Sequence, residues 1–339
     1  MTTPAQLLRA RYPDPADPAD PLVEAGPLDA LEARILLTHV LEWPRTALIT
    51  RADAVLPEQA VERYRQLVDR RLAGEPIAQL VGTREFYGLD FSVTPEVLIP
   101  RPETELLVEL ALEACHGIVQ PRILDLGTGS GAIAVSIAHQ RPDAVVTASD
   151  RSLSALAVAQ ANAARLLPPT RPGGRLTWLS GDWFGALDTL EHDAVNHETA
   201  GETADETADE TADEAISRRA PGSKPATAAT PYAVIVSNPP YIRADDPHLD
   251  QGDLRFEPRG ALTDEADGLE AIRAIIARAP EFLADGGWLW IEHGYDQSTE
   301  VAARLSARGF SAVRSVCDLA GIPRVSGGQF EHPSPTRAK

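Results

Sequence analysis

The sequence contains few cysteines and no long apolar run. Only two of its 339 residues are cysteine, Cys115 and Cys317, and they lie about two hundred positions apart. This excludes a disulfide framework and a Cys-x-x-Cys metal or redox pair, and a reducing compartment fits best. No window approaches the roughly 18 uninterrupted apolar residues of a membrane-spanning helix, and the first residues show no apolar signal-peptide core. We therefore expect a cytoplasmic protein without membrane contact.

Basic residues are too few to balance the acidic ones. The chain has 31 Lys and Arg against 50 Asp and Glu, which gives a formal net charge of −19 at pH 7. Non-specific affinity for nucleic acid comes mainly from Lys and Arg contacts with phosphates. The balance therefore argues against broad gripping of a nucleic-acid backbone, and we expect no direct nucleic-acid partner.

Part of this acidity is concentrated in residues 188–231, which hold eleven acidic and three basic residues, a net charge of −8. The tetrapeptide Glu-Thr-Ala-Asp begins at Glu202, Glu206 and Glu210. On a helix, like charges four residues apart would cost about 0.2–0.5 kcal/mol per pair. We interpret residues 188–231 as a solvated, disordered insertion. The alternative is an acidic segment that binds a partner.

Outside the insertion, two regions differ in the period of their apolar residues. Residues 27–43 and 57–73 carry apolar residues at helical spacing, and residues 86–93 alternate in the way of a short hairpin. From residue 103 onward, strand and helix patterns alternate. The expected strands are 122–126, 145–149, 175–179, 232–237, 287–292 and 312–317, and the expected helices are 131–140, 152–165, 267–284 and 297–308.

This alternation predicts an α/β fold with a mostly parallel sheet covered by helices on both faces. We expect two domains. Residues 1–95 would form a small helical domain with a hairpin linker, and residues 96–339 would form the α/β domain, interrupted by the insertion.

A glycine-rich loop follows the first expected strand of that domain. It reads Gly127-Thr128-Gly129-Ser130-Gly131. Alternate glycines let the backbone turn tightly and approach a ligand, as in dinucleotide-binding folds. The spacing is not that of a pyrophosphate site, and Asp125 disfavours an anion. S-adenosylmethionine, whose ammonium and sulfonium are both positive, fits better; the alternative is a merely structural turn. Asp150, at the end of the next strand, is placed to bind both ribose hydroxyls.

A second motif, Asn238-Pro239-Pro240-Tyr241, follows the apolar strand 232–237. The plain alternative is a Pro-rich turn. The strand would neighbour the first one, however, so both loops would open onto one crevice. An amide or aromatic amine nitrogen is a poor nucleophile because its lone pair is delocalised. If the Asn238 side-chain oxygen and the Pro239 carbonyl each accept one N–H, that lone pair is aimed at the methyl carbon.

The remaining residues of the motif suit this alignment. Proline fixes φ near −65° and has no N–H to compete, and the Tyr241 ring would pack against a flat substrate group. Rate would come from in-line positioning and preorganised acceptors. No general base is visible in the motif. We therefore expect proton loss after methyl transfer, to water or a neighbouring group.

With these motifs in place, the sequence resembles the peptide-chain release factor N(5)-glutamine methyltransferases, the HemK-type family. Asn-Pro-Pro-Tyr is shared with adenine-N6 and other amino methyltransferases, whereas Ile-Pro-Arg-Pro-Glu-Thr-Glu at 99–105 is much more specific to this family. The matching segments are 74–78, 84–89, 99–105, 125–131, 181–184, 237–242, 256–258 and 318–321.

The resemblance implies a Rossmann-like class I S-adenosylmethionine-dependent methyltransferase domain, with the small N-terminal helical domain helping to recognise a class I release factor. Asn238, Pro239, Pro240 and Tyr241 would hold the glutamine of that protein's Gly-Gly-Gln loop. Trp183 would lie next to the adenine, unless it is a core aromatic. The residues implied to contact the cofactor are Gly127, Thr128, Gly129, Ser130, Gly131, Asp150, Trp183 and Asn238. No metal site is expected.

Two other functions stay open. An adenine-N6 DNA or RNA methyltransferase would use the same nitrogen-holding loop, but it usually needs a basic target-recognition surface. A non-enzymatic S-adenosylmethionine-binding protein would use the insertion as a partner tail. Pro100 and Arg101 either line the glutamine entrance or, for Arg101, form a structural ion pair. We expect a monomer, and we interpret the Gly327-Gly328-Gln329 triplet as coincidence.

Overall fold

The computed structural model describes residues 2–9, 28–188 and 230–333. The insertion expected at 188–231 therefore lies outside the described residues, except for its two ends. The N-terminal part is helical, as expected. Its helices are α1 (Pro4–Arg9), α2 (Ala30–Leu41), α3 (Ala47–Thr50), α4 (Glu58–Leu72) and α5 (Ile77–Val81).

The helices α2 and α4 are the two that the apolar spacing predicted. The side chain of Asp29 caps α2 by accepting a hydrogen bond from the Leu31 backbone N–H at 2.7 Å. The buried side chains of α2 and α4 share one core, centred on Leu36, Leu37 and Tyr64. The helices α1, α3 and α5 were not predicted, because four to six residues are too few to show a helical period.

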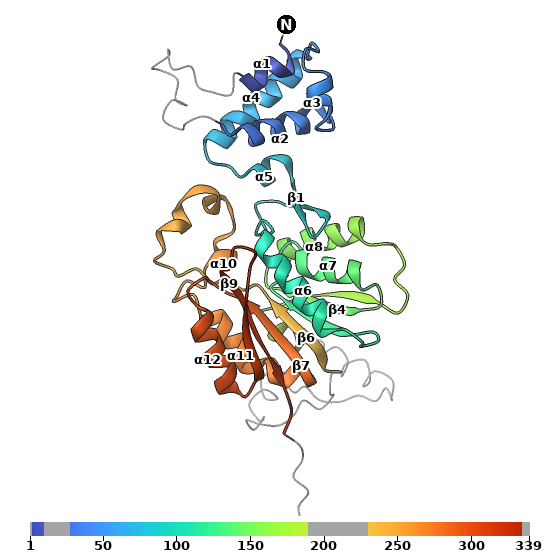
Figure 1. Cartoon of the computed structure of the whole chain (residues 1–339), viewed down its shortest axis with the longest axis vertical. Coiled ribbons are helices and arrows are strands. Elements are labelled where there is room, and N and C mark those ends of the chain that lie inside the picture. The colour runs from blue at the N-terminus through green and yellow to red at the C-terminus, as the bar shows by residue number, and fades with distance from the viewer. Residues whose placement is uncertain (1, 10–27, 189–229, 334–339) are drawn as a thin grey trace, which may run out of the picture.

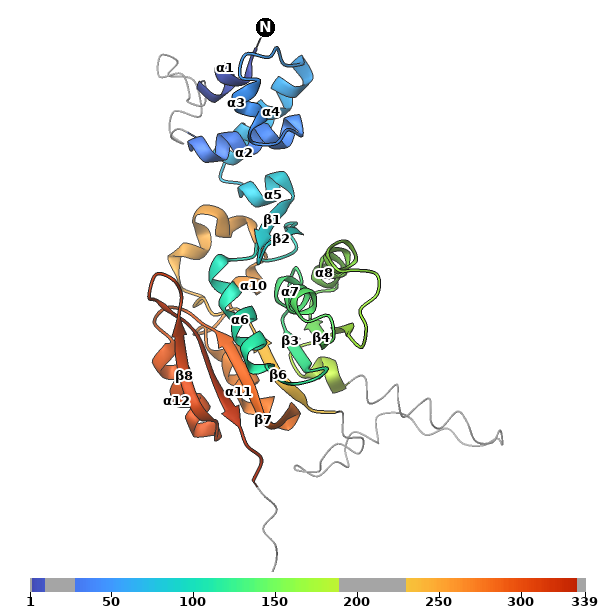
Figure 2. The same cartoon turned by 45° about the vertical axis from the view of Figure 1, so that its right-hand side comes forward.

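The predicted hairpin is present as β1 (Thr83–Phe86) and β2 (Leu89–Ser92), paired antiparallel. Its two-residue turn has positive φ at both Tyr87 (52°) and Gly88 (77°), the backbone that matches the twist of paired strands. The hairpin and α5 lie between the N-terminal helices and the sheet domain (Figures 1 and 2).

A seven-stranded sheet forms the second part, and all six strands predicted for it are present. Its order is β5-β4-β3-β6-β7-β9-β8. The first five of these strands pair in parallel, and β9 runs antiparallel to both β7 and β8. The strands are β3 (Arg122–Leu126), β4 (Val145–Asp150), β5 (Arg175–Ser180), β6 (Tyr232–Ser237), β7 (Leu283–Glu292), β8 (Ser311–Cys317) and β9 (Pro323–Phe330).

The strand β9 was missed, and it contains the Gly-Gly-Gln triplet. Glycine is depleted in strands, so the strand signal there is weak. The structure supplies a packing reason for both glycines. A Cβ on Gly327 would lie 2.1 Å from the Trp290 ring, and a Cβ on Gly328 would lie 2.9 Å from Cβ of Phe310. Close packing against Trp290 and Phe310 accounts for the two glycines of the triplet.

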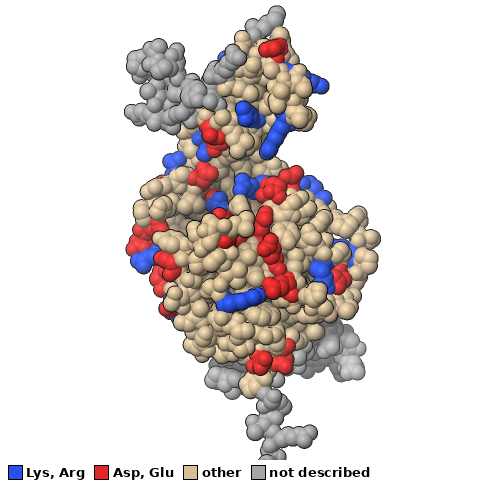
Figure 3. Space-filling view, viewed as in Figure 1, with Lys and Arg blue, Asp and Glu red and all other residues tan. Residues whose placement is uncertain are grey.

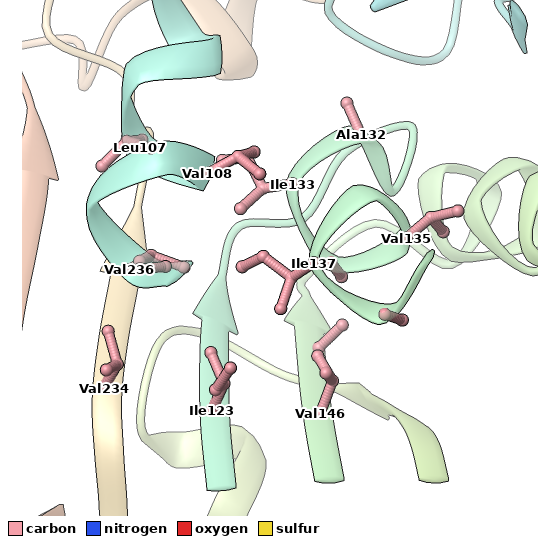
Figure 4. Close-up of a cluster of buried hydrophobic side chains, with 14 of the residues drawn as sticks. Leu107, Val108, Ile123, Ala132, Ile133, Val135, Ile137, Val146, Val234 and Val236 are labelled. Carbon is pink, nitrogen blue, oxygen red and sulfur yellow. The ribbon is translucent and has the colours of Figure 1, made fainter. Parts of the chain in front are cut away.

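Helices cover both faces of this sheet (Figures 1 and 2). Ile123 of β3 packs in the cluster beneath α6 and α7, whereas its neighbour Leu124 packs in the cluster beneath α11 and α12. Figure 4 shows the first of these clusters, in which Ile123 and Val236 face the helices. The covering helices are α6 (Glu105–Ala114), α7 (Ala132–Gln140), α8 (Leu153–Leu166), α11 (Glu270–Phe282) and α12 (Ser298–Arg308).

The strand order determines where a ligand can bind. The chain runs from β3 outward to β5 and then returns to place β6 on the other side of β3. In the parallel pairing of β3 with β6, Leu126 lies opposite Ser237. The loops after Leu126 and Ser237 therefore start side by side at the carboxyl edge of the sheet, where open α/β sheets bind their ligands.

Candidate active site

The glycine loop after β3 adopts a backbone that favours glycine. Gly127, Gly129 and Gly131 have φ of 74°, 54° and 82°, a region that side chains rarely adopt. A Cβ on Gly129 would meet no atom within 4 Å, so this position is open. A Cβ on Gly131 would lie 3.0 Å from Cβ of Ala159 on α8. The loop thus needs glycine both for its turn and for the approach of α8.

The Asp125 carboxyl supports this loop from within the protein. Its side chain is fully buried, and Oδ2 accepts a hydrogen bond from the Thr128 hydroxyl at 2.7 Å. Burial raises its pKa to about 7 against the lowering effect of the Thr128 bond. Asp125 does not line the pocket described below. The sequence predicts that the Asp125 charge lies beside the ligand. In the structure this charge does not face the pocket directly.

The Asp150 carboxylate does line the pocket, at the end of β4. Its Oδ2 accepts from the Gly129 backbone N–H at 2.9 Å, and its Oδ1 accepts from the Ser152 backbone N–H at 2.9 Å. These two bonds fix the carboxylate against the glycine loop. Each oxygen keeps a further lone pair, so a ligand hydroxyl has an acceptor there.

Trp183 follows β5 and closes another side of the same pocket. Its φ of 44° is left-handed, an outlier for a bulky side chain of the kind that concentrates at functional sites. The ring lies beside the glycine loop, since a Cβ on Gly127 would be 3.4 Å from Cζ3 of Trp183. The side chain is half-buried rather than enclosed in the core.

Asn238 lies across the pocket, directly after β6. Its Nδ2 donates to the Thr104 hydroxyl at 3.1 Å. Because the nitrogen and oxygen of an amide diverge from one carbon, this bond turns Oδ1 away from Thr104. Asn238 and Pro240 line the pocket, whereas Pro239 and Tyr241 do not.

The Tyr241 hydroxyl points into the protein and donates to Oε1 of Glu292 at 3.1 Å. Its ring packs against the core cluster beneath α11 and α12. Burial and the negative charge of Glu292 raise the pKa of Tyr241 well above its usual value. Burial likewise raises the pKa of Glu292 to about 7, partly offset by the hydroxyls of Thr104 and Tyr241.

Thr104 and Glu292 are the residues that reasoning from the sequence missed. Thr104 lies inside the family-specific segment 99–105, which was quoted as a match without a role for each residue. Glu292 ends the apolar run Trp288 to Ile291, and a carboxyl that closes a buried strand was the available signal.

Arg101 lines the pocket and also forms an ion pair. Its side chain lines the pocket together with Pro100. Its guanidinium also forms an ion pair with Glu257, whose side chain is fully buried. The other oxygen of Glu257 accepts from the Ile99 backbone N–H at 2.9 Å. The ion pair therefore holds the segment before α6 against the chain that follows β6.

One pocket brings these groups together. Besides the residues already described, it includes the carboxylates of Glu96 and Asp182 and the guanidinium of Arg151. Among the residues that the structure describes, no group of His, Cys, Asp and Glu side chains is arranged to hold a metal ion. The predicted residues that line it are Gly127, Thr128, Gly129, Ser130, Asp150, Trp183, Asn238 and Pro240.

The face of the molecule seen in Figure 3 shows no broad basic area, and its basic side chains gather mainly near the junction of the two parts of the molecule. A continuous basic surface is what a protein that grips duplex nucleic acid needs. In addition, none of the helices within the described ranges combines the length and the apolar character that crossing a membrane requires.

Comparison with known proteins gives two family matches and several close relatives. The PrmC N-terminal domain matches residues 20–82, and the methyltransferase small domain matches residues 102–172. A Burkholderia pseudomallei protein named release factor glutamine methyltransferase is 56% identical, over 94% of this chain and 98% of its own. Proteins of the same name from Bordetella pertussis and Pseudomonas aeruginosa are 48% and 40% identical, over 91% and 97% of this chain and 97% and 99% of their own.

The similarity to a solved structure is weak. A methyltransferase from Pyrococcus furiosus is 15% identical, with a TM-score of 0.41, over 79% of this chain and 98% of that chain.

Proposed function

The chain belongs to the release factor glutamine methyltransferase family, and we propose that its catalytic centre is the pocket between the carboxyl ends of β3 and β6. The protein transfers a methyl group from S-adenosylmethionine to the side-chain amide nitrogen of a release factor glutamine. The observation that carries the assignment of the centre is the position of Asn238, which shares one pocket with the glycine loop and Asp150.

The residues of this pocket fit S-adenosylmethionine, which supplies an electrophilic methyl group. Gly129 leaves open space beside the loop. Asp150 offers oxygen acceptors for ribose hydroxyls from a carboxylate already fixed by two backbone N–H groups. The half-buried Trp183 ring offers a flat apolar surface for the adenine. We propose that the loop Gly127 to Gly131, Asp150, Trp183 and Asn238 hold the cofactor.

The Asn-Pro-Pro-Tyr loop would hold the substrate amide. The Thr104 bond fixes the Asn238 amide group so that Oδ1 is directed away from Thr104. In our proposal Oδ1 of Asn238 and the backbone carbonyl of Pro239 each accept one N–H of the glutamine, which aims the nitrogen lone pair at the methyl carbon. Tyr241 supports the loop from beneath, through its bond to Glu292, instead of contacting the substrate.

The substrate amide must lose one proton. The carboxylates that line the pocket belong to Glu96, Asp150 and Asp182, and none is part of the Asn-Pro-Pro-Tyr loop. An amide nitrogen that has accepted a methyl cation is strongly acidic. We therefore propose that the proton leaves after methyl transfer, to water or to a neighbouring group.

We further propose that the substrate is a class I release factor, modified at the glutamine of its Gly-Gly-Gln loop. Residues 1–95 would help to recognise it, as a helical domain with its own core, and residues 96–339 would form the methyltransferase domain. The pocket is complete within one chain, which supports a monomer. The excess of acidic residues supports a partner other than nucleic acid, and the low cysteine content supports a cytoplasmic location.

A labelling experiment tests this function. The purified chain is incubated with methyl-labelled S-adenosylmethionine and one of three acceptors: a bacterial class I release factor, the same protein with the Gly-Gly-Gln glutamine changed to alanine, or duplex DNA. We expect label on the unmodified release factor only. Label on DNA, or equal label on the alanine variant, would contradict the proposal.

A further inference from the structure

We infer that Glu292 is a positioning residue of the methyl-transfer site: through Thr104 and Tyr241 it sets the direction in which Asn238 presents its amide oxygen. The inference rests on the proposed function, because it concerns the same pocket. It gives a role in positioning to a carboxyl group that does not itself line that pocket.

The strand pairing places Glu292 behind the Asn-Pro-Pro-Tyr loop. In the parallel pairing of β6 with β7, Ser237 lies opposite Ile291. The next residue along each strand is Asn238 and Glu292. The Glu292 side chain is only 1% exposed, and burying a carboxyl group is costly unless it has hydrogen-bond partners. Its partners should therefore show what it does.

One hydroxyl group bonds to Glu292, and a second hydroxyl lies nearby. Tyr241 donates to Oε1 at 3.1 Å. The Thr104 hydroxyl is close enough to favour the charged form of Glu292 as a hydrogen-bond donor does. Oε2 is buried, and no group within the described residues bonds to it with ordinary geometry. An acceptor is thus available beside the Thr104 hydroxyl.

In its ionised form, which predominates above its pKa of about 7, the Glu292 carboxylate can only accept hydrogen bonds. In the arrangement we infer, Thr104 donates its single proton to the unpaired Oε2 of Glu292, and its oxygen then serves as an acceptor on the other side. The group on that side is the Asn238 amide, and only its Nδ2 can donate. Asn238 is thereby held with nitrogen inward, as observed at 3.1 Å, and with Oδ1 available to the substrate.

The charges around Glu292 come from two other elements. Arg324 of β9 favours the charged form of the carboxyl, and Glu103 opposes it. Arg324 is itself held by Asp318, at 3.0 Å from Nε to Oδ2. Arg324 is thus a cation near Glu292 that bonds to Asp318 instead of Glu292. Both carboxylate oxygens of Glu292 therefore stay available for the two hydroxyls.

The inference also explains why the segment 99–105 belongs to this site. The short 3-10 helix η1 (Pro102–Thr104) brings Thr104 to Asn238, 134 positions away in the chain. The following residue, Glu105, accepts from the Tyr87 backbone N–H at 2.8 Å. The segment therefore ties the hairpin to the loop that holds the substrate.

The test compares isosteric variants of the two supporting residues. Glu292→Gln can donate where the carboxylate accepts, and Thr104→Val keeps the shape but removes the hydroxyl. We expect each to lower kcat for release factor methylation about 10- to 100-fold, as for a lost bond to a charged group. The dissociation constant for S-adenosylmethionine should change less than about threefold. Thr104→Ser should recover most of the loss, and Glu292→Gln combined with Thr104→Val should be little worse than either alone.

A matched control comes from the other end of β6. Tyr232→Phe removes a buried hydroxyl that bonds to Thr147 at 3.2 Å, and Tyr241→Phe removes the one that bonds to Glu292. Only Tyr241→Phe should lower kcat.

The inference is wrong if Glu292→Gln keeps the wild-type kcat, or if kcat falls only in proportion to cofactor affinity and melting temperature. If Glu292→Gln does not fold, Thr104→Val decides, and an unchanged kcat in that variant overturns the inference. Failure of the wild-type protein to methylate a release factor would instead contradict the proposed function.

Discussion

At the scale of single residues, the buried carboxyl of Asp125 lowers the stability of the folded protein but holds the glycine loop in one conformation. The hydrogen bonds that favour its ionised form come from the Thr128 hydroxyl, at 2.7 Å, and from the Ala134 backbone. Burial disfavours the ionised form and raises the pKa from 3.8 to about 7. The same carboxyl holds the loop in the shape that forms one wall of the pocket. Burial of this carboxyl therefore destabilises the folded state, while its hydrogen bond to Thr128 fixes the loop.

This predicts a pH dependence of stability. Asp125 ionises near its ordinary pKa in the unfolded chain but only near 7 in the folded protein. Its contribution is therefore fully present below about pH 4 and is lost as the pH rises toward 7. In Asp125→Asn that loss is absent, and the amide oxygen can still accept from Thr128.

The free energy of unfolding, measured with urea at pH 4.5 and pH 7.5, checks this. Relative to wild type, Asp125→Asn should gain stability at the higher pH, by up to a few kcal/mol. The control is Asp245→Asn. Asp245 is an exposed acid that pairs with Arg243, and this pairing lowers the pKa of Asp245. The difference in unfolding free energy between this variant and wild type should be the same at both pH values. A constant difference for Asp125→Asn would show that burial does not perturb this carboxyl.

The sequence indicated the residues that we propose contact ligands better than the residues that support them. Asn238, Asp150 and the glycine loop follow strands directly, so their spacing along the chain carries the signal. Thr104 reaches Asn238 across 134 positions, and Tyr241 reaches Glu292 across 51. Such contacts depend on which strands neighbour each other and on where η1 lies, and no local pattern encodes them.

At the scale of elements, the approach of α7 and α8 explains the last glycine of the loop. Gly131 has φ of 82° and is the cap residue before α7. A Cβ there would lie 3.0 Å from Cβ and 3.2 Å from Cα of Ala159 on α8. The second contact is with backbone, so relief requires one helix to move.

Gly131→Ala should therefore destabilise the protein more than an alanine at an uncrowded left-handed glycine. Gly117 provides the comparison, since its φ is 77° and a Cβ there would meet nothing within 4 Å. Gly117→Ala should cost only the left-handed strain of about 1–2 kcal/mol, and Gly131→Ala should cost roughly 1–3 kcal/mol more from overpacking. Urea unfolding of both variants measures the difference. Equal losses would mean that α8 adjusts freely.

The elements themselves were predicted where their patterns are long or apolar. The six expected strands and the helices of the α/β domain carry clear apolar runs or helical periods. The strand β9 was missed because glycine carries no strand signal, and it stands at Gly327, where the Trp290 ring packs, and at Gly328, where Phe310 packs. The segment between β6 and α11, which includes the 3-10 helix η4 (Gly252–Phe256) and the short helix α10 (Arg259–Leu262), has no period to detect.

At the scale of the whole molecule, the connection after β6 joins the N-terminal helices to the pocket. Arg71, at the end of α4, pairs with Asp253 at 3.0 Å, and the Gln79 amide donates to the Phe256 carbonyl at 3.0 Å. The next residue, Glu257, holds Arg101 at the pocket. The part of the chain proposed to recognise the release factor is thus in contact, through one segment, with a residue that lines the catalytic centre.

This arrangement suits a protein substrate that must reach two places at once. The N-terminal helices lie at one end of the molecule, with α5 and the hairpin between them and the sheet domain (Figure 1). A release factor bound along this length would present its glutamine to the carboxyl edge of β3 and β6. All of this depends on a single event at that edge, the transfer of a methyl group to an amide nitrogen that we propose Asn238 holds.

The most direct test is the rate of release factor methylation by Asn238→Ala, measured in single turnover with methyl-labelled S-adenosylmethionine, together with calorimetric measurement of cofactor binding. The account predicts a rate at least about 100-fold below wild type, the usual cost of removing a preorganised hydrogen-bonding group, with the dissociation constant for the cofactor within about threefold. A variant that methylates the glutamine at the wild-type rate would contradict the account, because the amide would then be held elsewhere.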